Sequence, residues 1–88
     1  MSLSVFEWDE DNVTHAIRHG VSKDEIEEII LDADLICKGR SGAYLAYGQT
    51  MDGRYLLAVF EYKGRNIAWP YSARPLTQNE KNKLKRRT

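Results

Sequence analysis

The stretch that decides the fold lies near the C-terminus and reads Trp69-Pro-Tyr-Ser-Ala-Arg-Pro-Leu-Thr-Gln-Asn-Glu80. Its first half is typical of a β-strand, and its last four residues form a capping box, which marks the start of a helix. Pro70 has no N–H to donate to a strand ladder, so this strand lies at a sheet edge or bulges there. The junction also carries Arg74 and Glu80 and leads into a basic segment, 81–87. Cations beside one acid suit chemistry on the phosphate of a nucleic acid.

Two further strands precede this stretch. Segments 43–50 and 54–62 are rich in aromatic and aliphatic residues, and Met51-Asp-Gly53 separates them. An Asp-Gly pair between two such runs is a strong hairpin signal. A second tight turn, 63–65, leads into a third strand over 66–74. These three strands predict an antiparallel sheet.

The N-terminal half predicts one short strand, over 5–8, and two helices. Asp9 caps the first helix, which ends near His19, and Gly20 suits the left-handed position that follows a helix. Ser22-Lys-Asp-Glu25 is a capping box that opens the second helix. The buried stripe of the second helix consists of Ile26, Ile29 and Ile30. The predicted order is β-α-α-β-β-β-α, a single α+β domain over residues 1–88 whose antiparallel sheet is accompanied by two N-terminal helices and one C-terminal helix.

Composition limits the class of protein. The 88 residues suffice for one domain with a modest core, and 42% of them are hydrophobic, as in a soluble globular protein. No apolar run approaches the roughly 20 residues of a membrane span, and no signal-peptide pattern is present. The single cysteine, Cys37, cannot form an internal disulfide, which favours a cytoplasmic protein. Because Cys37 follows Leu35 and Ile36, we expect its side chain to be buried in the core.

A net charge of zero hides a strong asymmetry between the two halves. Residues 1–37 hold ten acidic and two basic side chains, a net charge of −8. Residues 38–88 hold eleven basic and three acidic side chains, a net charge of +8. Such a division predicts either a basic face for a polyanion or two halves that neutralise each other.

Four short motifs resemble those of the BrnT toxin family, the ribonuclease members of BrnT–BrnA toxin–antitoxin pairs. The family pattern runs from F-x-W-D-E, through K/R-H-G-V-S, to S-A-R at a strand end and T-x-x-E at a helix start. In this chain the motifs stand at Phe6–Glu10, Arg18–Ser22, Ser72–Arg74 and Thr77–Glu80. Their order and spacing agree over almost the whole chain.

The resemblance implies a compact fold like that of the RelE-type ribonuclease toxins. It also implies RNA cleavage without a metal or other cofactor, and neutralisation by a DNA-binding ribbon-helix-helix antitoxin similar to BrnA. A homodimer or a toxin–antitoxin heterotetramer is compatible with it. The chain departs from the family pattern at Asn12, where a lysine is usual, and at Trp69, where an arginine is frequent. We therefore expect the phosphate-facing surface to lack two cations and cleavage to be weak.

RNA cleavage needs a base for the 2′-hydroxyl proton, an acid for the leaving 5′-oxygen and cations for the developing phosphate charge. Arg74 is the candidate for the cationic role, because a guanidinium binds phosphate through a planar fork. Arg54 opens the central strand and is expected to reach the same face. Glu80 is either a base or only the third helical member of its capping box.

Histidine titrates near neutrality, so His19 is a candidate for proton transfer, although a cation is also favoured at a helix C-terminus. His15 and His19 stand four positions apart, but no third metal ligand is indicated. Lys81 and Lys83 of the basic tail are candidates for holding RNA phosphates, and Tyr71 for stacking on a base.

These residues support three functions. The first is a ribonuclease toxin with the active site just described. The second is a non-catalytic interaction module that keeps the toxin fold and its antitoxin-binding surface. The third is an RNA-binding regulator that uses the basic half of the chain. The RNA target, the cleavage preference and the identity of the antitoxin do not follow from the sequence.

Overall fold

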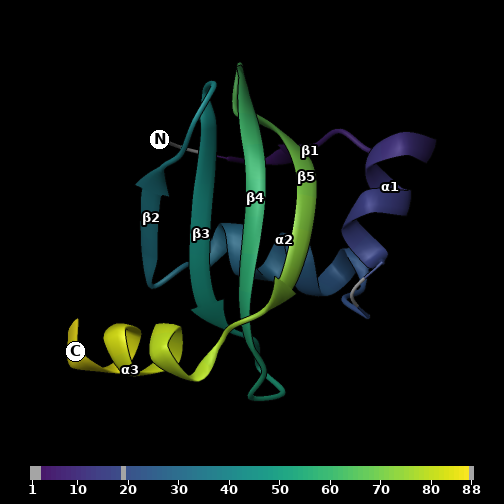
Figure 1. Cartoon of the computed structure of the whole chain (residues 1–88). Coiled ribbons are helices and arrows are strands. Elements are labelled where there is room, and N and C mark those ends of the chain that lie inside the picture. The colour runs from purple at the N-terminus through teal and green to yellow at the C-terminus, as the bar shows by residue number, and fades with distance from the viewer. Residues whose placement is uncertain (1–2, 19, 88) are drawn as a thin grey trace.

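Five strands form one sheet in the order β1-β5-β4-β3-β2, and three helices pack around it (Figure 1). The computed structural model describes residues 3–18 and 20–87, and their side chains except at 13, 15–17 and 87. The elements are β1 (Val5–Phe6), α1 (Glu10–Ile17), α2 (Lys23–Leu31), β2 (Leu35–Lys38), β3 (Ala43–Gln49), β4 (Tyr55–Gly64), β5 (Ile67–Pro75) and α3 (Gln78–Arg87). No helix of the described chain is both long and apolar enough to cross a membrane.

The local signals for helix starts are confirmed. Asp9 accepts from the backbone N–H of Asn12, and the Asn12 side chain accepts from the backbone N–H of Asp9. Ser22 and Glu25 make the same reciprocal pair at α2. Each such cap satisfies backbone donors that a helix leaves unpaired, which is worth about 1 kcal/mol. Gly20 has φ 76°, the left-handed conformation expected after α1.

The predicted strand count is wrong by one, because β2 was not anticipated. This four-residue strand forms the edge of the sheet beside β3. Cys37 lies on it and is only partly buried, contrary to the prediction of a core cysteine. The physical reason is that β2 is an edge strand. It has a neighbouring strand on one side only, so neighbouring side chains cover its own side chains only in part.

The sheet is also not wholly antiparallel. β1 pairs in parallel with β5, with Val5 opposite Ile67 and Phe6 opposite Ala68, and it is shorter than the predicted strand over 5–8. A parallel pair needs a long connection, and here it is most of the chain. The pairings of β3 with β4 and of β4 with β5 are antiparallel, as predicted. The unexpected β2 also pairs antiparallel, with β3.

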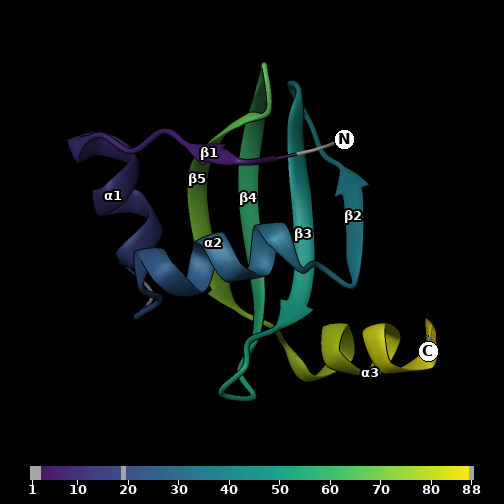
Figure 2. The same cartoon turned by 180° about the vertical axis from the view of Figure 1, so that it is seen from behind.

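The two faces of the sheet are covered by different helices (Figures 1 and 2). The α2 face is the one on which Leu56, Ala58 and Phe60 of β4 pack with three buried isoleucines of α2: Ile26, Ile29 and Ile30. Burial of each such side chain stabilises the fold by about 1.5–3 kcal/mol. The α3 face is the opposite one, where Leu57 of β4 packs with Leu76 and with Leu84 of α3. α3 lies across one end of this face (Figure 1).

Pro70 left open an edge strand or a bulge, and β5, which lies between β1 and β4, has a bulge there. Val59 of β4 pairs with Ser72 and Phe60 pairs with Pro70, so Tyr71 is an extra residue in β5. Beyond the bulge the alternation of β5 is shifted by one position. Ala68, Pro70 and Ala73 are therefore buried, while Ser72 and Arg74 share the α3 face with Val59 and Leu57.

Candidate active site on the α3 face

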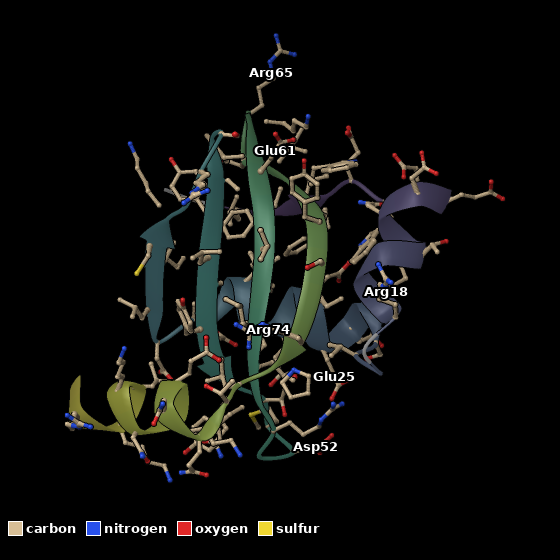
Figure 3. The ribbon with its side chains drawn as sticks, in the orientation of Figure 1. Arg18, Glu25, Asp52, Glu61, Arg65 and Arg74 are labelled. Atoms are coloured by element: carbon tan, nitrogen blue, oxygen red, sulfur yellow. The ribbon has the colours of Figure 1, made fainter. Side chains whose placement is uncertain are left out.

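The end of β5 and the first turn of α3 bring Arg74 and Glu80 together. Arg74 Nη1 donates to Glu80 Oε1 at 2.8 Å, and Nη2 donates to Oε2 at 2.9 Å. Figure 3 shows Arg74 on the side of the sheet that carries α3. Glu80 also accepts from the backbone N–H of Thr77 at 2.8 Å, and Thr77 Oγ1 accepts from the Glu80 N–H. The capping box expected over 77–80 is thus present, and its carboxylate orients the arginine.

The fork of Arg74 is only partly used. Nη1 makes one further bond, to the carbonyl of Pro75 at 3.1 Å. A guanidinium has five N–H donors, and these bonds account for three. The donors left over, on Nε and Nη2, form the second edge of the fork and have no bond to a described residue. The Arg74 side chain is 40% exposed, so it is not sealed from solvent.

The charges of the pair stabilise each other. The hydrogen bond from Arg74 lowers the pKa of Glu80 from 4.5 to about 2, against the opposing effect of desolvation. The bond to Glu80 likewise raises the pKa of Arg74. Glu80 is therefore a carboxylate at neutral pH and a weak base, so the geometry favours a positioning role over proton abstraction.

Tyr47 is a titratable neighbour across the sheet that interacts with both members of the pair. The register places Leu35, Tyr47, Leu57 and Arg74 in one row over four adjacent strands. Desolvation raises the pKa of Tyr47, and the negative charge of Glu80 raises it further. The phenol therefore stays protonated near neutrality and remains a hydrogen-bond donor.

A cavity of about 210 Å³ adjoins this row between α3 and the strands β2 and β3. Its lining consists of Leu35, Cys37, Tyr47, Glu80, Lys83 and Leu84. Glu80 belongs to both the cavity and the arginine pair, so the two features form one continuous site. The sequence did not indicate this cavity, since two of its six lining residues, Leu35 and Cys37, come from β2. One pattern in the sequence could have revealed β2. Leu35 and Cys37 alternate with Ile36 and Lys38, as expected if the two pairs point to opposite faces of a strand.

α3 supplies the cations of the site. Lys83 lines the cavity, whereas the ammonium groups of Lys81 and Lys85 lie over the ring of Tyr55, at 5.9 Å and 5.4 Å from its centroid. Arg86 is exposed farther along the helix. Lys81 and Lys83, both expected to contact RNA, thus lie on the same helix as Glu80 but in different surroundings.

Arg54 does not lie with Arg74, and the expectation that they share a face is wrong. Arg54 Nη1 donates to Glu25 of α2 at 2.8 Å and to the Gly20 carbonyl at 3.3 Å. The strand alternation of β4 explains this, because Arg54 has the parity of Leu56, which packs on the α2 face.

Asn12 was expected on the phosphate-facing surface, and this is also wrong. Its side chain is 1% exposed and is occupied by the α1 cap and by a bond to the Glu7 carbonyl at 2.8 Å. Trp69, in contrast, is half-buried on the same face as Arg74, near the opposite end of the sheet from α3. Its ring meets the exposed Tyr71 edge-on, with centroids 5.1 Å apart.

His19 lies outside the described residues, and so does the side chain of His15. Their proposed roles therefore stay predictions. Within the described part of the chain, no three His, Cys, Asp or Glu side chains are grouped as metal ligands.

Comparison with known proteins identifies the fold. No family model matches the sequence, and a search of curated proteins found no match. Among solved structures, the crystal structure of the Brucella abortus ribonuclease toxin BrnT is similar, with a TM-score of 0.65 and 15% sequence identity. The match covers 89% of this chain and 100% of that one. This protein therefore has a BrnT-type fold, a small α+β domain with a five-stranded, mostly antiparallel sheet and three helices.

Proposed function

We propose that this protein is a ribonuclease toxin whose active site lies on the α3 face around Arg74. The observation that carries the proposal is the bidentate Arg74–Glu80 pair, which holds one edge of the guanidinium and leaves the donors of the other edge without a bond to a described residue. The neighbouring cations of α3 and the BrnT-type fold support it. The substrate is single-stranded RNA, whose unpaired bases and flexible backbone fit an open sheet face.

In this mechanism the RNA 2′-hydroxyl attacks the adjacent phosphorus, and the bond to the 5′-oxygen breaks. The N–H groups on Nε and Nη2 of Arg74 bind the phosphate oxygens and stabilise their developing negative charge. Glu80 acts as a positioning residue, because it orients the guanidinium. His19 remains the candidate for proton transfer. The residues proposed for the reaction need no metal or other cofactor.

The test compares two arginines that are similarly exposed and similarly paired with a glutamate but lie on opposite faces of the sheet. Arg74 and Arg54 each form a 2.8 Å pair with a glutamate, and each side chain is 40% exposed. Arg74→Ala and Arg54→Ala should therefore lose similar stability, about 1 kcal/mol or less. Arg74→Ala should lower the cleavage rate about a hundredfold or more, and Arg54→Ala should cleave like the wild type. Equal cleavage by both variants would remove Arg74 from the site.

We further propose that an antitoxin similar to BrnA neutralises this protein by covering the α3 face. The cations of α3 favour an acidic or mixed-charge antitoxin segment, which would compete with RNA for Arg74 and Lys83. A homodimer or a toxin–antitoxin heterotetramer would accommodate that arrangement. Co-expression tests it: the antitoxin should rescue cells from the toxin and should block RNA binding in vitro.

A second function, a non-catalytic interaction module, is favoured by one specific observation. Glu80 is held as a weak base by Arg74, so the described part of the site offers no base that titrates near neutrality. Purified protein that binds the antitoxin but leaves RNA intact would identify this module. Binding of RNA without cleavage, and without toxicity, would instead identify an RNA-binding regulator.

A further inference from the structure

The cavity beside Arg74 is large enough to hold a planar aromatic ring. Its volume is about 210 Å³, whereas an apolar cavity of about 150 Å³ is enough to hold benzene. Leu35, Leu84 and Cys37 provide apolar walls, which favour the faces of an aromatic ring. A nucleobase is such a ring, with polar atoms on its edge.

The position of the cavity relates it to a bound phosphate. Glu80 is part of the wall and also holds Arg74, so the cavity opens next to the proposed phosphate site. Tyr47, on the wall, is two strands away from Arg74 in the same row, which is about 10 Å between backbones. That spacing suits the base of a nucleotide next to the phosphate that Arg74 binds.

The polar groups of the cavity are mainly donors. An ammonium such as that of Lys83 has three donors and no acceptor, and the protonated phenol of Tyr47 donates as well. Most of the acceptor capacity of Glu80 is engaged, because Oε1 accepts from Arg74 and from the Thr77 N–H, and Oε2 accepts from Arg74. This set fits the major-groove edge of guanine, which presents O6 and N7, or of uracil, which presents O4. On the same edge adenine and cytosine each present an exocyclic amine, at N6 and N4.

We propose that this cavity is a base-recognition pocket of the ribonuclease site, in which Lys83 and Tyr47 select guanine or uracil beside the scissile phosphate. The proposal rests on the proposed function for its phosphate, and it adds the substrate preference. Lys83 is then a specificity-determining residue, whereas Lys81 over Tyr55 contributes charge alone.

The first experiment measures preference. DNA oligonucleotides that carry a single ribonucleotide (G, U, A or C) are cleaved at one site, and the next base is varied in a second series. Wild type should cleave G or U substrates about tenfold faster than A or C substrates, as one good base contact allows. Lys83→Met should abolish that ratio, while Lys81→Met should slow all substrates equally. An equal ratio in Lys83→Met and wild type would overturn the proposal.

The second experiment fills the pocket. Cys37 points into the cavity, whereas Ile36, its neighbour on β2, is 40% exposed on the opposite side of the strand. Cys37→Trp should remove the base preference, and Ile36→Trp should keep it; thermal melting checks that both variants fold. Folded Cys37→Trp with the wild-type preference, or with a loss of antitoxin binding alone, would refute the pocket.

Binding separates this proposal from the proposed function. Titration with oligouridylate and oligoadenylate measures the preference without cleavage. If wild type cleaves RNA with no base preference and binds both polymers equally, the pocket is wrong and the ribonuclease stands. If wild type cleaves nothing but binds oligouridylate about tenfold more tightly in a Lys83-dependent way, the ribonuclease is wrong and the pocket stands.

Discussion

Trp69 and Arg74 share one face of the sheet, although an odd number of positions separates them along β5. Trp69 pairs with Glu61 and Arg74 pairs with Leu57, and these two residues of β4 lie on the same side of their strand. In a regular strand Trp69 and Arg74 would point to opposite faces. The extra residue, Tyr71, shifts the alternation between them.

Because Trp69 lies on the face that carries Arg74, Trp69→Arg tests whether bound RNA extends along this face as far as residue 69. Trp69 is half-buried, and its Nε1 is 3.4 Å from Asp9 Oδ2, so an arginine has both space and a nearby acid. We expect the variant to fold and to bind RNA with a steeper salt dependence, by about 0.7 in the log–log slope. Cleavage should rise with it. A folded variant with an unchanged slope would show that RNA does not reach this end of the face.

Asn12→Lys introduces the lysine that the resemblance to BrnT toxins would place at this position, yet we expect it to harm this protein. The change removes the capping partner of Asp9 and introduces a charge at a site that is 1% exposed. The free energy of unfolding should fall by about 2–4 kcal/mol, as measured in urea. Asp11→Lys, at an exposed position in the first turn of the same helix, is the control and should cost only about 1 kcal/mol, because it reverses a charge that the helix dipole favours. A stable Asn12→Lys protein would contradict the buried position.

Glu80→Gln separates positioning from proton transfer. The amide keeps the size of the side chain but replaces one oxygen of the fork with a donor, so Arg74 is less well held. If Glu80 positions Arg74, kcat should fall only about tenfold, and the pH–rate profile near neutrality should keep its shape. A loss of about a thousandfold, accompanied by the disappearance of the acidic limb of the profile, would identify Glu80 as the base.

The Arg74–Glu80 pair should also give stability an acid-sensitive component. The pKa of Glu80 is about 2 in the folded protein and 4.5 ordinarily, so the unfolded state takes up its proton first as pH falls. The stabilisation is complete above pH 4.5 and is lost as pH falls from 4.5 towards 2. The difference in free energy of unfolding between wild type and Glu80→Gln should therefore be constant near neutrality and shrink over this range. A difference that does not change with pH would contradict the ion pair.

Electrostatic steering gives the last prediction. If an antitoxin segment binds the cations of α3, its association rate should fall with added salt, because screening weakens the attraction between opposite charges. Lys81→Met and Lys83→Met should each reduce that salt dependence, whereas Lys63→Met, on β4 near Trp69, should leave it unchanged. The measurement is stopped-flow binding at low and high salt. A rate that salt does not alter would argue against the α3 face as the antitoxin site.

The sequence by itself determined the features whose partners lie within a few residues. The cap at Asp9, the capping boxes at Ser22 and Thr77 and the left-handed Gly20 were predicted and are present. Pro70 predicted an edge strand or a bulge, and the bulge is present. So was the proximity of Arg74 and Glu80, which are six positions apart. Such features depend on backbone donors and dihedral preferences that neighbouring side chains satisfy directly.

Tertiary structure alone decided which face each functional side chain occupies. Arg54 and Arg74 look equivalent in the sequence, yet they pair with glutamates on opposite faces. Cys37 looks like a core residue, yet it lines a cavity because β2 is an edge strand. The reason is that the face of a side chain depends on the register between strands that are far apart in sequence. One extra residue in a strand reverses the face of every side chain that follows it in that strand.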